Sequence, residues 1–272
     1  MGIPSIPKIN RLLTSVSGLA STDPAAAYIA AITATGATVT PTQRSAINTF
    51  ITTGETEGWY ALLKRFYLPI WQVAGANAIC LKSLTSGTFV GDVTHTVGGA
   101  YSGYTGYMNT NVNILGLGIA SSYHYSVLFV NNIGEGYDAP FGTVQDVYFF
   151  SDDGNFACQI EDVTIDMRVF AESSGFGITT LGGNQFDRYV KNRTTSGVAT
   201  ITDTQDFELL SYPSNNNIFF LARNAGSNSP NATYNNTLGA FGIASELTNS
   251  QDTAYTLALK TLWETTTGLT LL

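Results

Sequence analysis

Three acidic residues in the sequence QIEDVTIDMR, Glu161, Asp162 and Asp166, are the carboxylates whose spacing comes closest to acid–base chemistry. A glycosidase needs two carboxyl groups that face one sugar, about 5–10 Å apart depending on its mechanism. On a β-strand Asp162 and Asp166 lie on one face and Glu161 lies on the other. Asp162 and Asp166 are then about 13 Å apart, which is too far. The sequence therefore predicts that the chain is not an enzyme, and a glycosidase is the least favoured alternative.

The two histidines, His95 and His124, belong to no recognisable catalytic motif. The chain has no G-x-S-x-G elbow, which a serine nucleophile of that class would use, and no H-E-x-x-H zinc motif. Phosphate-binding and dinucleotide-binding glycine motifs are also absent. We therefore expect both histidines to pack within strands at surface or half-buried positions, and we expect no cofactor.

Oxygen ligands and thiols offer two further candidates. The segment Asp152-Asp153-Gly154-Asn155 is rich in the oxygen atoms that Ca²⁺ prefers, although a plain Asp-Gly hairpin turn is the favoured explanation. Cys80 and Cys158 are either two small buried side chains or the two halves of one disulfide. Neither pattern predicts a metal site.

Three tyrosines in the sequence GAYSGYTGYMN, Tyr101, Tyr104 and Tyr107, are the candidate contact residues. Aromatic rings in a glycine-rich loop can stack on sugars or on a protein partner. The alternative is that they pack at the edge of a β-sandwich. The sequence leaves both open.

The composition excludes several classes of protein. The chain has 272 residues and a net charge of −8, and only 12% of its residues are charged. An acidic chain without a basic face predicts no nucleic-acid partner. Its apolar runs are too short for a membrane span, and residues 1–20 lack the apolar core of a secretion signal. A surface rich in Thr, Asn and Gly suits strands, turns and packing against neighbouring copies.

The N-terminal quarter of the chain has helical patterns. Residues 1–22 form a proline-marked arm, and residues 23–75 form a helical leader. Within the leader, Asp23-Pro24 opens one helix that stops at Gly36, and the Thr40–Gln43 capping box opens a second that stops at Gly54. A third helical fragment is predicted over residues 55–66.

Residues 76–272 have the pattern of a sandwich domain. About a dozen short apolar runs alternate with turn residues, which is typical of an antiparallel jelly roll. A closing helix follows Leu247 and ends near Gly268. The predicted fold is thus mainly β, an antiparallel jelly-roll sandwich of the concanavalin A-like kind, with an N-terminal helical leader and a C-terminal helix.

Several segments resemble structural proteins of tailed bacteriophages. The resemblance rests on Thr40–Phe50, Gly58–Trp71, Gly87–His95, Thr105–Asn111, Leu238–Leu247 and Ala254–Leu269. It implies a concanavalin A-like or laminin-G-like sandwich used in tail appendages, fibres or head decorations. It carries no catalytic residue that can be transferred to this chain.

The resemblance implies a non-enzymatic virion component that assembles in many copies. Its partners would be copies of itself and other virion proteins, with host surface glycans as a further option, and its location would be the virion. The alternative is a carbohydrate-binding, lectin-like module that uses the three tyrosines.

Overall fold

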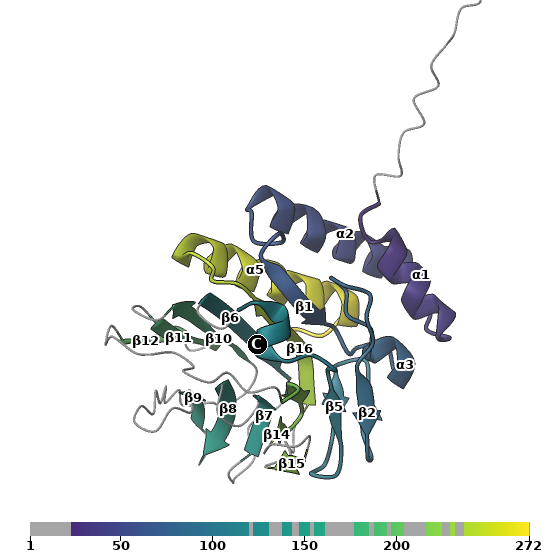
Figure 1. Ribbon diagram of the computed structural model, residues 1–272. Coiled ribbons are helices and arrows are strands. Elements are labelled where there is room, and N and C mark those ends of the chain that lie inside the picture. Colours follow the sequence, from purple (N-terminus) through teal and green to yellow (C-terminus); the bar gives the residue numbers. More distant parts are fainter. Residues whose placement is uncertain are drawn as a thin grey trace, which may run out of the picture.

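The computed structural model describes residues 23–119, 122–130, 138–142, 147–152, 155–160, 177–184, 188–194, 197–203, 216–224, 229–231 and 237–271. The arm at 1–22 and the apolar runs predicted within 161–176 and 204–215 lie outside these residues. The described part has three layers: a helical layer, an eight-stranded sheet and a six-stranded sheet (Figure 1).

The eight-stranded sheet forms the middle layer and is antiparallel throughout. Its strands, in spatial order, are β12 (Gly197–Asp203), β11 (Arg188–Thr194), β10 (Gly177–Asn184), β6 (Ser122–Phe129), β16 (Thr237–Ala244), β4 (Ala100–Tyr101) and β3 (Thr94–His95). The eighth strand, β1 (Leu63–Tyr67), also pairs with β16.

The six-stranded sheet is antiparallel and forms the outer layer. Its strands, in spatial order, are β2 (Thr88–Val90), β5 (Tyr107–Asn109), β13 (Phe219–Phe220), β7 (Asp138–Gly142), β8 (Val147–Asp152) and β9 (Asn155–Ile160). A separate two-stranded ladder joins β14 (Arg223–Asn224) to β15 (Pro230–Asn231).

Strand β6 shows how the middle sheet supplies two hydrophobic cores. Tyr123, Tyr125, Val127 and Phe129 belong to a core that also holds Met108 and Phe220 of the six-stranded sheet. Leu128 belongs to a second core, shared with the helices. Because successive side chains of a strand point to opposite faces, both faces of the middle sheet are buried.

The helical layer contains α1 (Ala26–Ala34), α2 (Pro41–Thr56) and α5 (Asn249–Thr267), while α3 (Ala74–Asn77) and α4 (Ile114–Leu117) are single turns in connections. The predicted capping box at the start of α2 is confirmed: Thr40 accepts from the Gln43 backbone, and Gln43 accepts from the Thr40 backbone. Thr248 and Gln251 cap α5 in the same way. Gly268, with φ 71°, ends α5 as expected.

The prediction of a helix over residues 55–66 is wrong. Leu63–Tyr67 forms β1, whose backbone groups pair with those of β16. Gly54 does not stop α2, which continues to Thr56. Gly54 is instead a packing position, because a Cβ there would lie 2.6 Å from the Trp59 ring. Tertiary pairing and packing outweigh local pattern at both places.

The coarse prediction for the fold is confirmed. The described part is mainly β, its two large sheets are antiparallel and face each other, and helices accompany them at both ends of the sequence. The predicted strand runs at 123–130, 155–160, 176–181 and 238–244 correspond to β6, β9, β10 and β16. Pairing of Asp152 with Asn155 shows that β8 and β9 form the predicted hairpin.

Two glycines of β16 allow α5 to lie directly on the middle sheet. A Cβ at Gly242 would lie 2.4 Å from the Tyr255 hydroxyl and 2.6 Å from the Ser126 hydroxyl. A Cβ at Gly239 would lie 2.5 Å from Nε1 of Trp263, which donates to the Gly98 carbonyl. These contacts leave no room for a methyl group between the helix and the sheet.

We predict that Gly242→Ala lowers the free energy of unfolding by about 1–3 kcal/mol, because the added methyl group overpacks the core. Denaturant unfolding measures the change. Gly98→Ala is the matched control, since a Cβ there makes only ordinary contacts of 3.4 Å. Equal stability of the two variants would show that α5 does not lie this close to β16.

Candidate functional site

The three predicted contact tyrosines lie in or beside the connection between the two sheets. We call residues 101–107 the tyrosine loop; it leaves β4 of the eight-stranded sheet and enters β5 of the six-stranded sheet. Tyr101 is 37% exposed and Tyr104 is 47% exposed. Tyr107 is half-buried and stacks on Phe219, with ring centroids 4.5 Å apart. Tyr101 and Tyr104 are thus on the surface, whereas Tyr107 packs against the sheet.

Tyr104 occupies a backbone conformation that large side chains rarely adopt. Gly103 and Tyr104 have φ angles of 53° and 67°, and the Thr105 backbone N–H donates to the Ser102 carbonyl over 3.0 Å. Two consecutive positive φ angles define a type I′ turn, in which Asn and Gly are the usual residues. The Tyr101 ring packs over Gly103, where a Cβ would lie 3.3 Å from it. The turn therefore places both exposed tyrosines within one short segment, Tyr101–Tyr104.

The turn between β2 and β3, residues 91–93, packs closely against the tyrosine loop. A Cβ at Gly91 would lie 2.2 Å from the Thr105 carbonyl oxygen, and a Cβ at Gly106 would lie 2.6 Å from the Asp92 carbonyl oxygen. The Thr105 hydroxyl bonds to the Ser102 carbonyl at 2.9 Å. Such close backbone contacts fix the loop before any ligand arrives, which lowers the entropy cost of binding.

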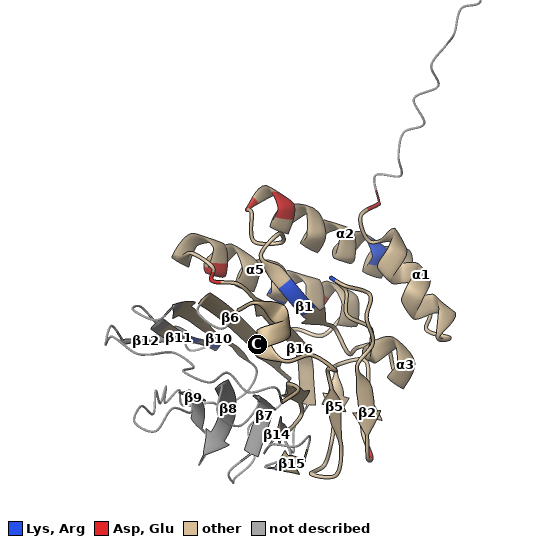
Figure 2. Ribbon diagram, viewed as in Figure 1, with Lys and Arg blue, Asp and Glu red and all other residues tan. Residues whose placement is uncertain are grey.

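The sequence around the tyrosine loop carries no positive charge. No Lys or Arg occurs between Lys82 and Arg168, and Asp92 is exposed in the turn beside the loop. In Figure 2 the nearest coloured position at this end of β2 is acidic. Tyr101, Tyr104 and Asp92 therefore place aromatic rings, hydroxyl groups and a carboxylate in this part of the described chain.

A second polar cluster lies beneath α5 and was not predicted from the sequence. Asp252 is fully buried and accepts from Nε2 of His124 over 3.0 Å and from Nζ of Lys191 over 2.9 Å. Arg193 also pairs with Asp252, and Lys191 donates to Asn249. The cluster joins the first turn of α5 to β6 and β11.

The electrostatics of this cluster follow from burial and from the neighbouring charges. Burial alone would raise the pKa of Asp252, but the hydrogen bond from His124 and the charges of Arg193 and Lys191 outweigh it and hold that pKa well below its ordinary value. Burial lowers the pKa of His124 and outweighs the raising effect of the hydrogen bond and charge of Asp252, while the charges of Arg193 and Lys191 lower it further. Asp252 is therefore ionised and His124 neutral near pH 7.

This cluster holds α5 on the sheet and does not face solvent. His124 is 1% exposed, and the Tyr255 ring meets the His124 ring edge-on at 5.5 Å while its hydroxyl bonds to Ser126 at 2.7 Å. Both histidines lie within strands as expected, but His124 is fully buried, whereas a surface or half-buried position was predicted for each. His95 is half-buried, touches Phe89 and bonds to Asn77, and burial lowers its pKa.

The remaining candidates fall largely outside the described residues. Glu161, Asp162 and Asp166 lie there, as do Asp153 and Gly154 of the predicted calcium turn. Cys80 is a buried free thiol, as its packing alternative predicted, so it does not bridge to Cys158. Within the described ranges, no group of three or more His, Cys, Asp or Glu side chains could hold a metal ion. The described helices are all too short or too polar to cross a bilayer.

The fold and the tyrosine loop together define a helix-backed antiparallel β-sandwich with an exposed aromatic turn. No protein-family model and no curated protein sequence matches the chain. Solved structures do share the fold. Domain 4 of AbnA, an extracellular arabinanase from Geobacillus stearothermophilus in complex with arabinotriose, matches with a TM-score of 0.53 at 14% identity, over 71% of this chain and 98% of that domain.

Sialidase from Trypanosoma rangeli, in complex with sialic acid, matches with a TM-score of 0.53 at 10% identity. The match covers 78% of this chain but only 38% of the sialidase chain. At such identities the likeness shows a common fold. These two neighbours are named as a domain of an arabinanase and as a sialidase.

The prediction that the chain is not an enzyme is overturned by this comparison. Its structural neighbours include an arabinanase domain and a sialidase, so a fold of this kind occurs in proteins named as enzymes. The prediction failed because it weighed only carboxylate spacing within one segment. In a folded sandwich, carboxylates from separate strands can converge, and local spacing cannot reveal them.

We predict that Asp252→Asn lowers the free energy of unfolding by about 3–5 kcal/mol, because Lys191 and Arg193 then remain buried without a counter-charge. Denaturant unfolding at pH 7 measures this loss. Asp92→Asn, which changes an exposed carboxylate, is the control. A loss no larger than that of the control would mean that the cluster does not hold α5.

The same carboxylate sets a dependence on pH. Because its folded-state pKa is depressed, Asp252 stabilises the protein fully above the ordinary aspartate value of 3.8, and this stabilisation is lost as the pH falls through the lower folded pKa. We expect the stability difference between the natural chain and Asp252→Asn to be constant from pH 7 to about pH 4 and to shrink below it. Urea unfolding across that range tests this, and a difference that grows on acidification would contradict it.

Proposed function

We propose that the chain is a carbohydrate-binding module that contacts glycans through Tyr101 and Tyr104 of the tyrosine loop. The observation that carries the proposal is the match to domain 4 of AbnA, which extends over 98% of that domain and was solved with arabinotriose. A domain of the same fold and similar extent is thus named with a bound oligosaccharide. We further propose that the sandwich is the jelly-roll, concanavalin A-like kind.

The geometry of the loop supports a contact role. Tyrosine offers a large, rigid, amphipathic surface at a low cost in side-chain entropy, and its ring can cover the apolar face of a sugar while its hydroxyl stays wet. The strained turn at Tyr104 presents such a ring where Asn or Gly would be the usual residue. Strain kept in an exposed turn is a mark of functional sites.

The lack of Lys and Arg in the stretch of sequence that contains the loop favours neutral glycans. Sialic acid and other acidic sugars carry a carboxylate, which proteins bind best through arginine. The sequence from 83 to 167 contains neither Lys nor Arg, and Asp92 lies beside the loop. We therefore propose neutral oligosaccharides, arabinan fragments among them, in preference to sialylated ones.

We predict that Tyr104→Ala weakens glycan binding by at least about tenfold, equal to about 1.4 kcal/mol, and that Tyr101→Ala has a similar effect. A glycan array followed by calorimetry with neutral and sialylated oligosaccharides measures it. Val97→Ala removes a comparably exposed apolar side chain (38%) outside the loop and is the matched control.

An array without signal, or binding that survives both tyrosine changes, would overturn the proposal. Preference for sialylated glycans would overturn the part based on charge. Oligosaccharides that have been incubated with the protein are also analysed for shorter cleavage products. Turnover that is lost in Glu161→Gln would favour the glycosidase alternative.

The virion role stays a prediction that rests on the sequence resemblance. It would place many copies of the chain in a tail appendage, fibre or head decoration. Glycan binding by the tyrosine loop is compatible with that setting, since such a component meets the host surface. Electron microscopy of an assembled particle would test it.

A further inference from the structure

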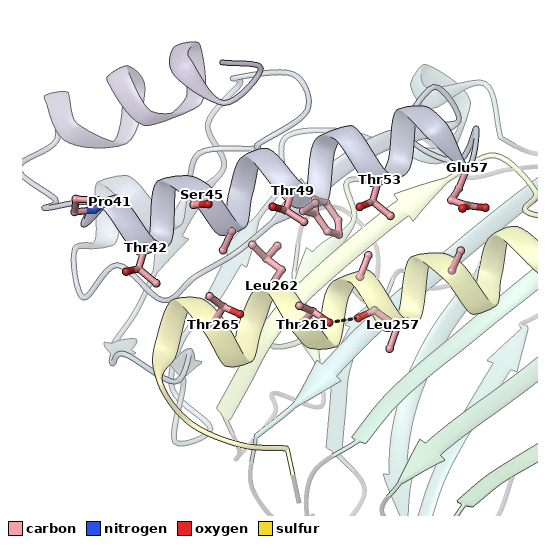
Figure 3. Close-up of a pocket in the computed structure, with 14 residues that line it drawn as sticks. Pro41, Thr42, Ser45, Thr49, Thr53, Glu57, Leu257, Thr261, Leu262 and Thr265 are labelled. Atoms are coloured by element: carbon pink, nitrogen blue, oxygen red, sulfur yellow. Dashed lines mark hydrogen bonds between the residues drawn. The ribbon is translucent and has the colours of Figure 1, made fainter. Parts of the chain in front are cut away.

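A groove runs between α2 and α5 on the outer side of the helical layer. It has a volume of about 730 Å³. Figure 3 shows Ser45, Thr49 and Thr53 of α2 facing Leu257 and Thr261 of α5 across it. The groove is separate from the tyrosine loop, and the inference drawn from it does not depend on the proposed function.

The lining of the groove suits an apolar helix. The buried side chains of Ala46, Phe50 and Leu262 contribute to it, and Leu257 at its edge is 65% exposed. The Thr261 hydroxyl donates to the Leu257 carbonyl of its own helix, so its hydrogen bond is already made. Small side chains on both helices allow another backbone to approach closely.

The N-terminal arm has the pattern that such a groove accepts. Ile9, Leu12, Leu13 and Val16 recur at the spacing i, i+3, i+4 and i+7. This is the anchor pattern by which an amphipathic helix lies in a hydrophobic groove. Residues 9–16 would span about 12 Å as a helix, shorter than the groove side of α2, at about 24 Å.

The described chain begins beside α2, at residues that do not line the groove. Asp23 pairs with Arg44 over 2.8 Å, and the Ala25 backbone donates to Asn48 over 2.9 Å. Both contacts are with the first turns of α2. Residues 17–22 can extend about 20 Å, which exceeds the helix diameter of about 10–12 Å, so they can cross α2 to its other side.

Charge favours one direction for the docked arm. From the crossing point, residues 16 to 9 would run along α2 towards its C-terminal end, where Glu57 lines the groove. Lys8 and Arg11 would then approach Glu57. The arm has no acidic residue, whereas residues 23–272 contain all 20 acidic residues and only 10 basic ones.

We propose that residues 9–16 dock as an amphipathic helix in the groove between α2 and α5 of the same chain. The short connection to α1 keeps the arm at a high effective concentration near its own groove, which favours this source over a second copy. The docked arm covers Leu257 and links the two long helices on their outer side.

Paramagnetic broadening in the full-length chain tests the proposal. A spin label on Asn10→Cys should cause loss of the methyl signals of Ala46, Leu257 and Ala258, with recovery when the label is reduced. The chain without this substitution, treated with the same reagent, accounts for label on Cys80 or Cys158. In the double variant Leu12→Asp/Leu13→Asp the methyl signals should stay sharp. In Thr14→Asp/Ser15→Asp, which adds the same charge on the opposite face of the arm, they should still be broadened.

The outcomes separate the alternatives. Groove signals that stay sharp, or that broaden equally in both double variants, would overturn the proposal. A mixture of isotope-labelled chains without spin label and spin-labelled chains without isotope should show no broadening. Broadening in this mixture would assign the groove to the arm of a second copy, and would overturn docking within one chain.

A charge exchange tests the direction of docking. Glu57→Lys should reduce the broadening of the groove signals, and Lys8→Glu/Arg11→Glu in the same chain should restore it. If Glu57→Lys reduces the broadening but Lys8→Glu/Arg11→Glu does not restore it, the assigned direction is overturned.

Discussion

The whole structure depends on one constraint: the eight-stranded sheet is covered on both faces. The six-stranded sheet covers one face, and α2 and α5 contribute to the core on the other. All but one residue of β6 and every residue of β16 are consequently buried. A polar group on these strands must find its partner inside the protein, because water is not available to it. His124 and Ser126 do so through Asp252 and Tyr255 of α5.

This pairing determines where surface function can lie. The glycines at 239 and 242 and the charges around Asp252 hold α5 close to the sheet, so the helical side of the central strands is closed to a ligand. The end of the sandwich near β2, β4 and β5 remains, where short strands give way to turns. The tyrosine loop lies at this end and connects the two sheets. A rigid sandwich that presents a turn is a common way to build a binding surface.

The sequence predicted features that depend on neighbouring residues and missed those that depend on distant ones. The capping box at Thr40, the end of the last helix at Gly268 and the run that becomes β6 are local patterns. Strand β1 was missed because its partner β16 is far along the chain. The charged cluster was missed for the same reason, since His124 and Asp252 are 128 residues apart in sequence. The sequence did show that Lys191 and Arg193, two residues apart, would lie on one face of a strand. That spacing does not identify their acidic partner.

The exposure of Tyr104 shows how a site can be separated from the fold that carries it. A fold shared at 14% identity with an arabinanase domain and at 10% with a sialidase is compatible with different chemistries, and the residues of the site must distinguish between them. Tyr104 takes a left-handed position in a turn, where Asn or Gly is the usual residue, and remains 47% exposed. The conformation costs free energy and exposes apolar surface. The proposed contact with a sugar face would offset both costs.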